Sequence, residues 1–288
     1  MSQLLYLDSK AHAHMGWKPV DTYHYAGRFS VVPVGLEELP RVLPVYPLAF
    51  FRPRAEQPLQ LVALTGLRPG QNLYVSPEDG RWTAPYRPKA IDLYPFVLQP
   101  RPDGAHQYAV GFRVESGALR ERPQELLGEH RFFTDDGHQT AAFAHVVKRL
   151  NQEVQAAQWA TRAAAALQAH HLLEPWPGAQ PQGQDAQSLD ASVGLFRVHE
   201  EKLNALDGPA LKALQQANAL PLAYGQLLSL SRMEVLQRLA TFYERTRQTA
   251  PASTPTNTAT TTTAATPDLD MVQKLFEPGQ PDTIKFNW

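Results

Sequence analysis

The spacing of apolar residues changes once along the chain, at the turn Asp135-Asp136-Gly137, and this change constrains the fold more than any other feature. Before the turn, short runs rich in β-branched and aromatic residues alternate with turn sequences such as Pro69-Gly70. After it, apolar residues recur every three or four positions, which is the period of an α-helix. We therefore expect strands in residues 1–135 and helices in residues 136–248.

The first half predicts antiparallel pairing, because Gly, Asp and Pro supply tight turns between successive apolar runs. One short helix is expected among the strands, at residues 36–43, with Pro40 inside it. The predicted strands are Arg28–Val34, Val45–Phe51, Gln60–Leu64, Asn72–Val75, Asp92–Leu98 and His106–Val114.

The second half predicts a long helix from about residue 138 to residue 171, capped by Asp136 with Gln139 as its capping-box partner. Its apolar stripe consists of Phe143, Val147, Leu150, Val154 and Ala157. Shorter helices are expected at 200–206, 209–217 and 224–247, the second capped by Asp207. The buried face of the last helix is predicted to be Leu228, Val235, Leu239 and Phe242.

These elements predict an α+β fold, with an N-terminal antiparallel β-rich half, a long helix and a C-terminal helical cluster packed on it. We expect one domain over residues 1–248. Residues 249–267 are almost entirely Thr, Ala and Pro, a composition that predicts a flexible linker. Residues 268–288 are too apolar for a solvated tail, so this segment is expected to dock, either on its own body or on a partner.

Composition excludes several classes of partner and chemistry. With 27 basic and 28 acidic side chains the net charge is close to zero, so we expect no nucleic-acid binding. The absence of cysteine removes thiolate chemistry and cysteine-ligated metals. No apolar run approaches the length that spans a bilayer, which predicts that this is not an integral membrane protein.

The first ten residues contain no basic segment followed by an apolar run, so we expect no secretory signal and a cytoplasmic location. Export to the cell surface without a signal peptide is the alternative.

No local motif identifies a reaction. His12 and His14 would share one face of a strand, but two histidines near a terminus are more often surface residues than metal ligands. Gly66–Asn72 lacks the glycine spacing and the Lys-Ser/Thr of a phosphate loop, and no nucleophile elbow is present. The sequence therefore predicts no metal and no cofactor, and it names no catalytic residue.

The densest chemical feature is the run Asp79–Pro88, followed by Tyr94–Phe96, which concentrates aromatic, arginine and proline residues. Flat rings stack on sugars and on extended peptides, and arginine forks donate hydrogen bonds, so the segment is a candidate binding face. The alternative is that its rings close the core of the sheet. The predicted binding residues are Arg68, Asn72, Arg81, Trp82, Tyr86 and Tyr94, and His14 with Glu38 forms a separate candidate polar site.

Several stretches together resemble the SapC family of bacterial proteins. They are Val32–Val34 with Glu38, Tyr46–Phe50, Gly66–Val75, Gly80–Trp82 with Tyr86 and Pro88, Tyr94–Phe96, Leu172–Trp176, Phe196–Val198, Glu201–Leu203, Leu220–Ser229 and Asp282–Trp288. The stretch Lys89–Asp92 departs from the expected aromatic and arginine pattern. A peptide-transporter permease of the same name is unrelated, because this chain lacks transmembrane segments.

The resemblance implies a bacterial protein associated with a surface-layer locus or with outer-surface and nutrient-uptake genes, and it implies no particular reaction. The first functional hypothesis is an accessory protein in which Gly66–Phe96 and the terminal Asp282–Trp288 form one surface that binds a protein or peptide partner, or a glycan. The second is an enzyme whose site combines His14, Glu38, Asn72 and Arg81. A structural component of the surface layer is a third, and the sequence does not decide whether the protein is an enzyme.

Overall fold

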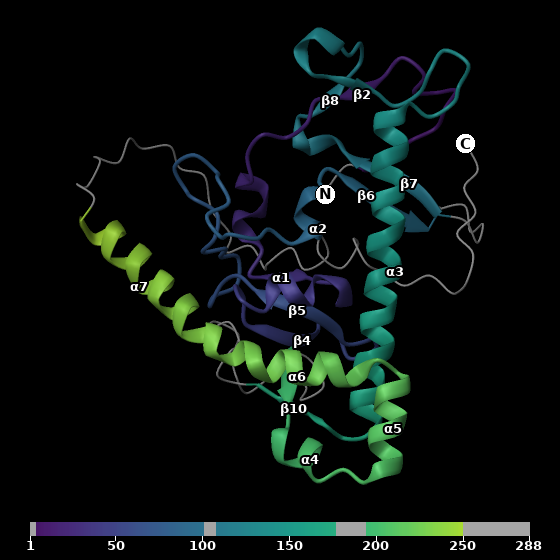
Figure 1. Ribbon diagram of the computed structural model, residues 1–288. Coiled ribbons are helices and arrows are strands. Elements are labelled where there is room, and N and C mark those ends of the chain that lie inside the picture. Colours follow the sequence, from purple (N-terminus) through teal and green to yellow (C-terminus); the bar gives the residue numbers. More distant parts are fainter. Residues whose placement is uncertain (1–3, 101–107, 177–193, 250–288) are drawn as a thin grey trace.

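The computed structural model describes residues 4–100, 108–176 and 194–249, and Figure 1 traces their arrangement. The predicted docking segment 268–288 lies outside these residues, as does the predicted linker except for Thr249, the last residue of the last helix. Among the residues that are described, no helix has both the length and the apolar character needed to cross a bilayer.

The largest sheet has five antiparallel strands in the order β10-β11-β4-β5-β3. Their bounds are β10 Leu173–Pro175, β11 Gly194–Val198, β4 Leu48–Arg52, β5 Gln60–Leu64 and β3 Val31–Pro33. Its central strands are apolar on both faces because each face is covered by other elements, and Leu48, Ala49 and Phe50 are inaccessible to solvent. Since β10 and β11 follow the long helix in sequence, the N-terminal half does not complete this sheet alone.

Two smaller antiparallel sheets complete the β structure. One has the order β1-β7-β6, with β1 Leu4–Tyr6, β7 Tyr108–Arg113 and β6 Phe96–Pro100. The other has the order β8-β2-β9, with β8 Leu119–Arg120, β2 Gly16–Trp17 and β9 His130–Arg131. Strands of two or three residues carry too few positions to produce a readable alternation, and β1, β2, β8 and β9 were not predicted from the sequence.

The antiparallel α+β class is confirmed, and the predicted strands outside Asn72–Val75 each overlap an observed strand. The prediction at Asn72–Val75 is wrong. The side chain of Asn72 accepts a hydrogen bond from the backbone amide of Tyr74 at 3.0 Å, which bends the chain into a turn, and only Val75 forms an isolated bridge, to Trp82. The expected helix at 36–43 is present as the 3₁₀ turn η2 (Leu36–Glu38) and α1 (Leu39–Val42).

The long helix α3 (Ala141–Ala169) runs along the molecule beside the five-stranded sheet and the β1-β7-β6 sheet (Figure 1). Four residues of its predicted stripe, Phe143, Val147, Leu150 and Val154, are buried against β6 and β7. The fifth, Ala157, is half-buried and packs on a separate cluster. The cap is Thr140 rather than Asp136: the Thr140 side chain accepts from the amide of Phe143 at 3.3 Å. Thr140 lies directly before the first helical residue, where an N-cap acts.

The C-terminal helices pack on the five-stranded sheet and on the end of α3. They are α4 Glu200–Asn204, α5 Gly208–Gln216, α6 Ala219–Ser229 and α7 Met233–Thr249. The predicted cap at Asp207 is confirmed, since its carboxylate accepts from the amide of Ala210 at 2.9 Å. The single helix expected at 224–247 is instead two helices, joined by the 3₁₀ turn η6 (Leu230–Arg232).

The predicted buried face of the last helix is wrong for most of its residues. Leu228 is 73% exposed and Phe242 is 61% exposed, whereas Leu236 is fully buried. The residues that face the core recur every three or four positions through η6, and they are Gln226, Ser229, Met233, Leu236, Ala240 and Tyr243. The helical period therefore continues across η6, and the prediction chose a neighbouring face of the helix.

Buried polar side chains join α6 to the sheet. Gln226 accepts from the amide of Val198 at 2.9 Å and donates to the carbonyl of Leu48 at 3.2 Å. Ser229 accepts from the amide of Leu48 at 2.8 Å. Both side chains are inaccessible to solvent, so they connect α6 with β4 and β11 through hydrogen bonds that water cannot replace.

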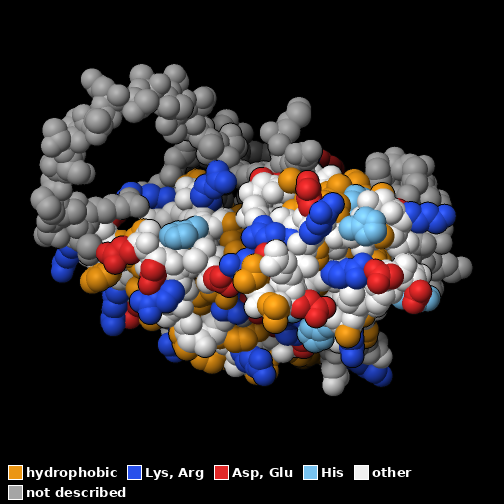
Figure 2. All heavy atoms as spheres, turned by 90° about the horizontal axis from the view of Figure 1, so that it is seen from above, with side chains coloured by type: hydrophobic (Ala, Val, Ile, Leu, Met, Phe, Trp, Pro, Cys, Tyr) orange, Lys and Arg blue, Asp and Glu red, His pale blue; other side chains and the backbone are white. Residues whose placement is uncertain are grey.

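Figure 2 shows one face of the molecule, on which basic and acidic side chains are interspersed. This distribution agrees with the near-zero net charge.

Candidate functional site

The segment from Trp82 to Phe96 contains most of the aromatic and arginine residues that the sequence singles out. It enters the fold through a turn at Gly80, whose φ of +68° favours glycine. A Cβ at Gly80 would lie 2.6 Å from the ring of His24, so the close approach also excludes a side chain. The carbonyl of Gly80 accepts from the amide of Tyr23 at 2.7 Å, which ties the turn to the N-terminal segment.

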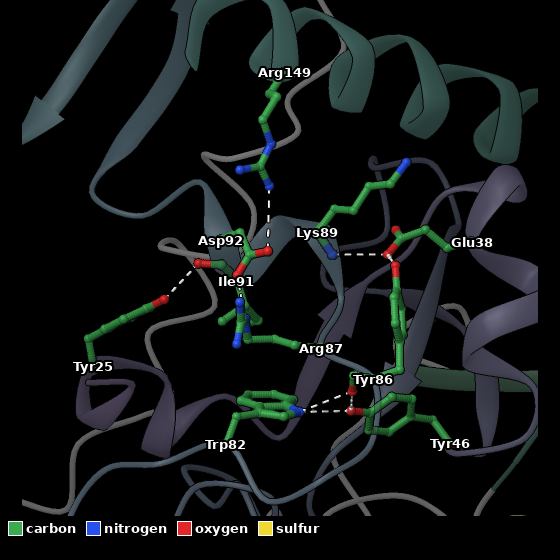
Figure 3. A network of polar contacts seen from close by, with 10 residues as sticks. All are labelled: Tyr25, Glu38, Tyr46, Trp82, Tyr86, Arg87, Lys89, Ile91, Asp92 and Arg149. Carbon is green, nitrogen blue, oxygen red and sulfur yellow. Dashed lines mark hydrogen bonds and ion pairs between the residues drawn. The ribbon is translucent and has the colours of Figure 1, made fainter. Parts of the chain in front are cut away.

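Trp82 is held by hydrogen bonds inside the protein. Its indole nitrogen donates to the hydroxyl of Tyr46 at 3.0 Å and to the backbone carbonyl of Tyr86 at 3.1 Å (Figure 3). The hydroxyl of Tyr46 donates to the same carbonyl, and burial raises the pKa of that hydroxyl strongly. Half-buried Trp82 therefore fixes the course of the backbone at 82–86.

Glu38 is 1% exposed and has a hydrogen-bond donor for each carboxylate oxygen. Its Oε1 accepts from the hydroxyl of Tyr86 at 2.6 Å and from the backbone amide of Lys89 at 2.9 Å, and its Oε2 accepts from the amide of Gly35 at 3.1 Å. Burial, together with the bond to Glu38, raises the pKa of the Tyr86 hydroxyl. Glu38 thus links the start of η2 to the start of α2 (Lys89–Asp92).

Beyond this buried network, Asp92 lies between two arginines. The Nε of Arg87 donates to its Oδ1, and the Nη2 of Arg149 on α3 lies 3.5 Å from its Oδ2. The guanidinium of Arg87 also lies over the ring of Tyr23, 4.4 Å from the ring centre. The hydroxyl of Tyr25 donates to the carbonyl of Ile91 at 2.6 Å. The pKa of this hydroxyl is raised, mainly by burial and to a smaller extent by the charge of Asp92.

These residues border a cavity of about 300 Å³ between the N-terminal segment, α2 and α3, which we call the α2–α3 pocket. Its aromatic lining residues are Trp17, Tyr23, Tyr25, Tyr94 and Phe96, and its charged lining residues are Arg87, Asp92 and Arg149. The rings of Tyr25 and Tyr94 are stacked with centres 3.8 Å apart. Flat aromatic walls with a few convergent polar groups are typical of small-ligand sites.

The structure distributes the predicted binding residues over different environments. Tyr94 lines the α2–α3 pocket, whereas Trp82 and Tyr86 anchor the segment that forms its wall. Asn72 is buried, and its amide donates to the carbonyl of Ala26 at 3.0 Å, bracing a loop.

The two other predicted binding residues, Arg68 and Arg81, are exposed. Arg68 forms an ion pair with Glu244 of α7 at 2.8 Å, and Arg81 pairs with Asp79 of its own turn. Neither arginine lines the α2–α3 pocket.

The residues of the enzyme hypothesis are not brought into contact. His14 is exposed and lies near Asp135, whose pKa is lowered mainly by Arg131 and slightly by the charge of His14. Among His14, Glu38, Asn72 and Arg81, all of them described, no hydrogen bond or ion pair joins one to another. No group of three or more His, Asp or Glu residues suited to a metal ion occurs in the described ranges.

Sequence reasoning missed Arg87, Asp92 and Arg149 as a group. Arg87 and Asp92 lie within the segment that the sequence highlights, so the density of that segment was the available signal. Arg149 lies on α3 outside the apolar stripe. At such a position the sequence does not distinguish an arginine that faces a pocket from one that faces solvent.

Glu153 is a second buried acid that no motif marked. It is 5% exposed, and the Nζ of Lys89 lies 3.8 Å from its Oε1. Burial, and then the charge of Glu38, raise its pKa to about 7, while Lys89 acts in the opposite direction. The cavity of about 10 Å³ that it borders has room for about one water molecule.

A family model described as SapC matches residues 7–236 of the chain. Comparisons with curated proteins and with solved structures gave no match.

Proposed function

The chain belongs to the SapC family, and from that premise we propose that it is an accessory binding protein that holds one small, ring-bearing ligand in the α2–α3 pocket. The observation that carries the proposal is the combination in one cavity of five aromatic rings with Arg87, Asp92 and Arg149. Aromatic faces bind the apolar faces of sugars and other rings, and the charged groups orient polar substituents. In this role the protein serves an outer-surface or nutrient-uptake system.

The size of the pocket limits the ligand. At about 300 Å³ it lies at the lower end of the range for small-molecule sites, which is roughly 300–1,000 Å³. One sugar residue of a glycan, or the end of a peptide, fits this volume. A protein partner would enter the pocket only through such a projecting group.

An enzyme remains the second candidate because of one observation, the pKa of Glu153, raised to about 7. Carboxyl groups tuned toward neutral pH are common among catalytic bases. The space that Glu153 borders, about 10 Å³, favours the binding hypothesis because a substrate needs more room. An enzyme of this fold would therefore depend on Glu153 and Lys89 rather than on His14 and Asn72.

Occluding the pocket tests the proposal. Val146 lines it from α3, so Val146→Phe fills space that a ligand would occupy. Ala144→Phe is the matched control, because Ala144 is exposed on the same helix. The intact protein is first screened on arrays of glycans and short peptides, and binding of each hit is then measured by calorimetry.

We expect Val146→Phe to abolish binding of the hits and Ala144→Phe to retain it, with both variants folded by circular dichroism. Equal binding by both folded variants, or no hit on either array, would overturn the proposal. If Val146→Phe does not fold, Val146→Leu is used with the same criterion, since it adds a single methylene.

A further inference from the structure

The charged residues of the α2–α3 pocket are unequal in sign. Two guanidinium groups, those of Arg87 and Arg149, face one carboxylate, that of Asp92. The charge of Arg149 also lowers the pKa of Glu153 slightly, but Glu153 forms its ion pair with Lys89. The other charged pair near Tyr94 is Arg113 with Glu115, 3.7 Å apart, which adds no net charge. The pocket therefore carries an excess of one positive charge.

The same two arginines have unused hydrogen-bond donors. Within the described part of the chain, Arg149 makes no hydrogen bond, because its approach of 3.5 Å to Asp92 is longer than a normal N–H···O contact. Arg87 uses its Nε for Asp92, and its two terminal nitrogens have no acceptor among the described residues. Each guanidinium has five N–H donors, so most of this capacity is not used within the described part of the chain, and both side chains border the cavity.

An excess of positive charge combined with planar donor forks suits an anionic group with two oxygen atoms. Arginine binds carboxylates through two parallel N–H···O bonds, and these charge-assisted bonds are about twice as strong as neutral ones. Figure 3 shows Arg149 extending from α3 toward Asp92, with Arg87 on the opposite side of that carboxylate. A ligand carboxylate in the pocket would give the arginines a second acceptor.

The walls favour a sugar over a peptide. Peptides are commonly bound by adding a strand to a free sheet edge, through backbone hydrogen bonds. Strand β6 is an edge strand, but of its residues the pocket reaches Phe96, and the preceding residue is Pro95, which has no amide proton. The other walls include the aromatic side chains of Trp17, Tyr23, Tyr25 and Tyr94, and rings of this kind pack against the apolar face of a sugar.

On these grounds we infer that the ligand of the α2–α3 pocket is an acidic sugar, whose carboxylate is bound by Arg149 and Arg87 and whose ring lies against the tyrosine side chains. This inference rests on the proposed function and adds the substrate class to it.

The test compares each acidic sugar with its uncharged methyl ester. Calorimetry of the intact protein uses glucuronate, galacturonate and N-acetylneuraminate, together with the methyl ester of each. Removing a charge-assisted pair lowers affinity by about tenfold or more, so we expect at least one acid to bind about tenfold or more tightly than its ester. Its binding should also weaken as salt is raised.

Variants assign the effect to the arginines. Arg149→Gln should reduce the affinity for the acid by about tenfold or more while leaving the affinity for the ester within about twofold. Arg149→Lys, which keeps the charge but loses the planar fork, should recover part of the affinity. Arg162→Gln is the matched control, because Arg162 is exposed on the same helix, and it should bind as the parent protein does.

The outcomes separate the two levels of the proposal. Equal affinity for acids and esters, both sensitive to Val146→Phe, would overturn the acidic-sugar inference and leave the binding pocket standing. Tighter binding of a peptide with a free C-terminal carboxylate than of any sugar would overturn the sugar class. If neither the acids nor the esters bind, both the inference and its premise fail for sugars.

Discussion

Tyr86 illustrates how one residue holds the candidate site without forming part of it. Its hydroxyl donates to buried Glu38 and its carbonyl accepts from Trp82, so both ends of the residue are fixed by hydrogen bonds. The neighbouring residue, Arg87, lines the α2–α3 pocket. The buried network therefore determines where the pocket wall lies.

The variant Tyr86→Phe separates this anchoring role from a binding role. It removes one donor from a buried carboxylate, and we expect the free energy of unfolding to fall by about 1–3 kcal/mol. Because the hydroxyl does not line the pocket, ligand affinity should remain within about twofold of the parent value. Chemical denaturation and calorimetry on the same preparation check both statements, and lost affinity with unchanged stability would contradict them.

Glu153 predicts a dependence of stability on pH. Its pKa is raised from 4.5 to about 7, so between these values the folded protein holds a proton that the unfolded chain releases. Stability from this residue is therefore complete below about pH 4.5 and is lost as the pH rises through about 7.

The variant Glu153→Gln removes this titration. Its free energy of unfolding should decline less than that of the parent between pH 5 and pH 8, by up to about 3 kcal/mol. Denaturant titrations at several pH values measure the difference, with Glu200→Gln, an exposed position on α4, as the control. Parallel pH profiles for Glu153→Gln and the parent protein would show that Glu153 does not titrate in this range.

At the scale of elements, the contact between α6 and the five-stranded sheet depends on Gln226. The variant Gln226→Leu keeps the volume but leaves the amide of Val198 and the carbonyl of Leu48 without partners in a dry interface. We expect it to lower the free energy of unfolding by about 2–4 kcal/mol. Gln215→Leu, at an exposed position of α5, should change it by less than about 0.5 kcal/mol. Comparable losses in both variants would contradict this account.

The spacing of apolar residues predicted the elements that are long enough to repeat that spacing several times. The stripe of α3 and the cap at Asp207 follow from local rules, and both are present. The strand at Asn72–Val75 failed because one side-chain hydrogen bond outweighs β propensity there. The predicted buried face of α7 is wrong because apolar residues such as Val235 and Phe242 also lie on its exposed face, so the period alone does not say which face packs on the core.

The candidate site was predictable only in part, for a different reason. The segment Trp82–Phe96 attracted attention through its composition, and it does form one wall of the α2–α3 pocket. The opposite wall comes from Trp17 and Arg149, which are separated by more than a hundred residues. Pairing residues so distant in sequence requires the packing of α3 against the β-rich half, which a single sequence does not encode in readable form.

At the scale of the molecule, the two halves of the sequence form a joint structure. Strands β10 and β11 complete the sheet begun by β3, β4 and β5, and α3 packs on this sheet and on the β1-β7-β6 sheet. We therefore expect residues 1–248 to unfold as one cooperative unit. Limited proteolysis should cleave first within residues 249–267, and the product should retain a single thermal transition. Early cleavage near residue 136, giving two stable halves, would contradict a single domain.

Hydrogen–deuterium exchange, with and without a ligand identified on the arrays, tests whether the α2–α3 pocket is the binding site. We expect slower exchange in residues 17–25 and 87–96 and around Arg149 on α3, with α7 unchanged. Slower exchange confined to α7, or to the turn at 66–81, would place the ligand elsewhere and contradict the proposal.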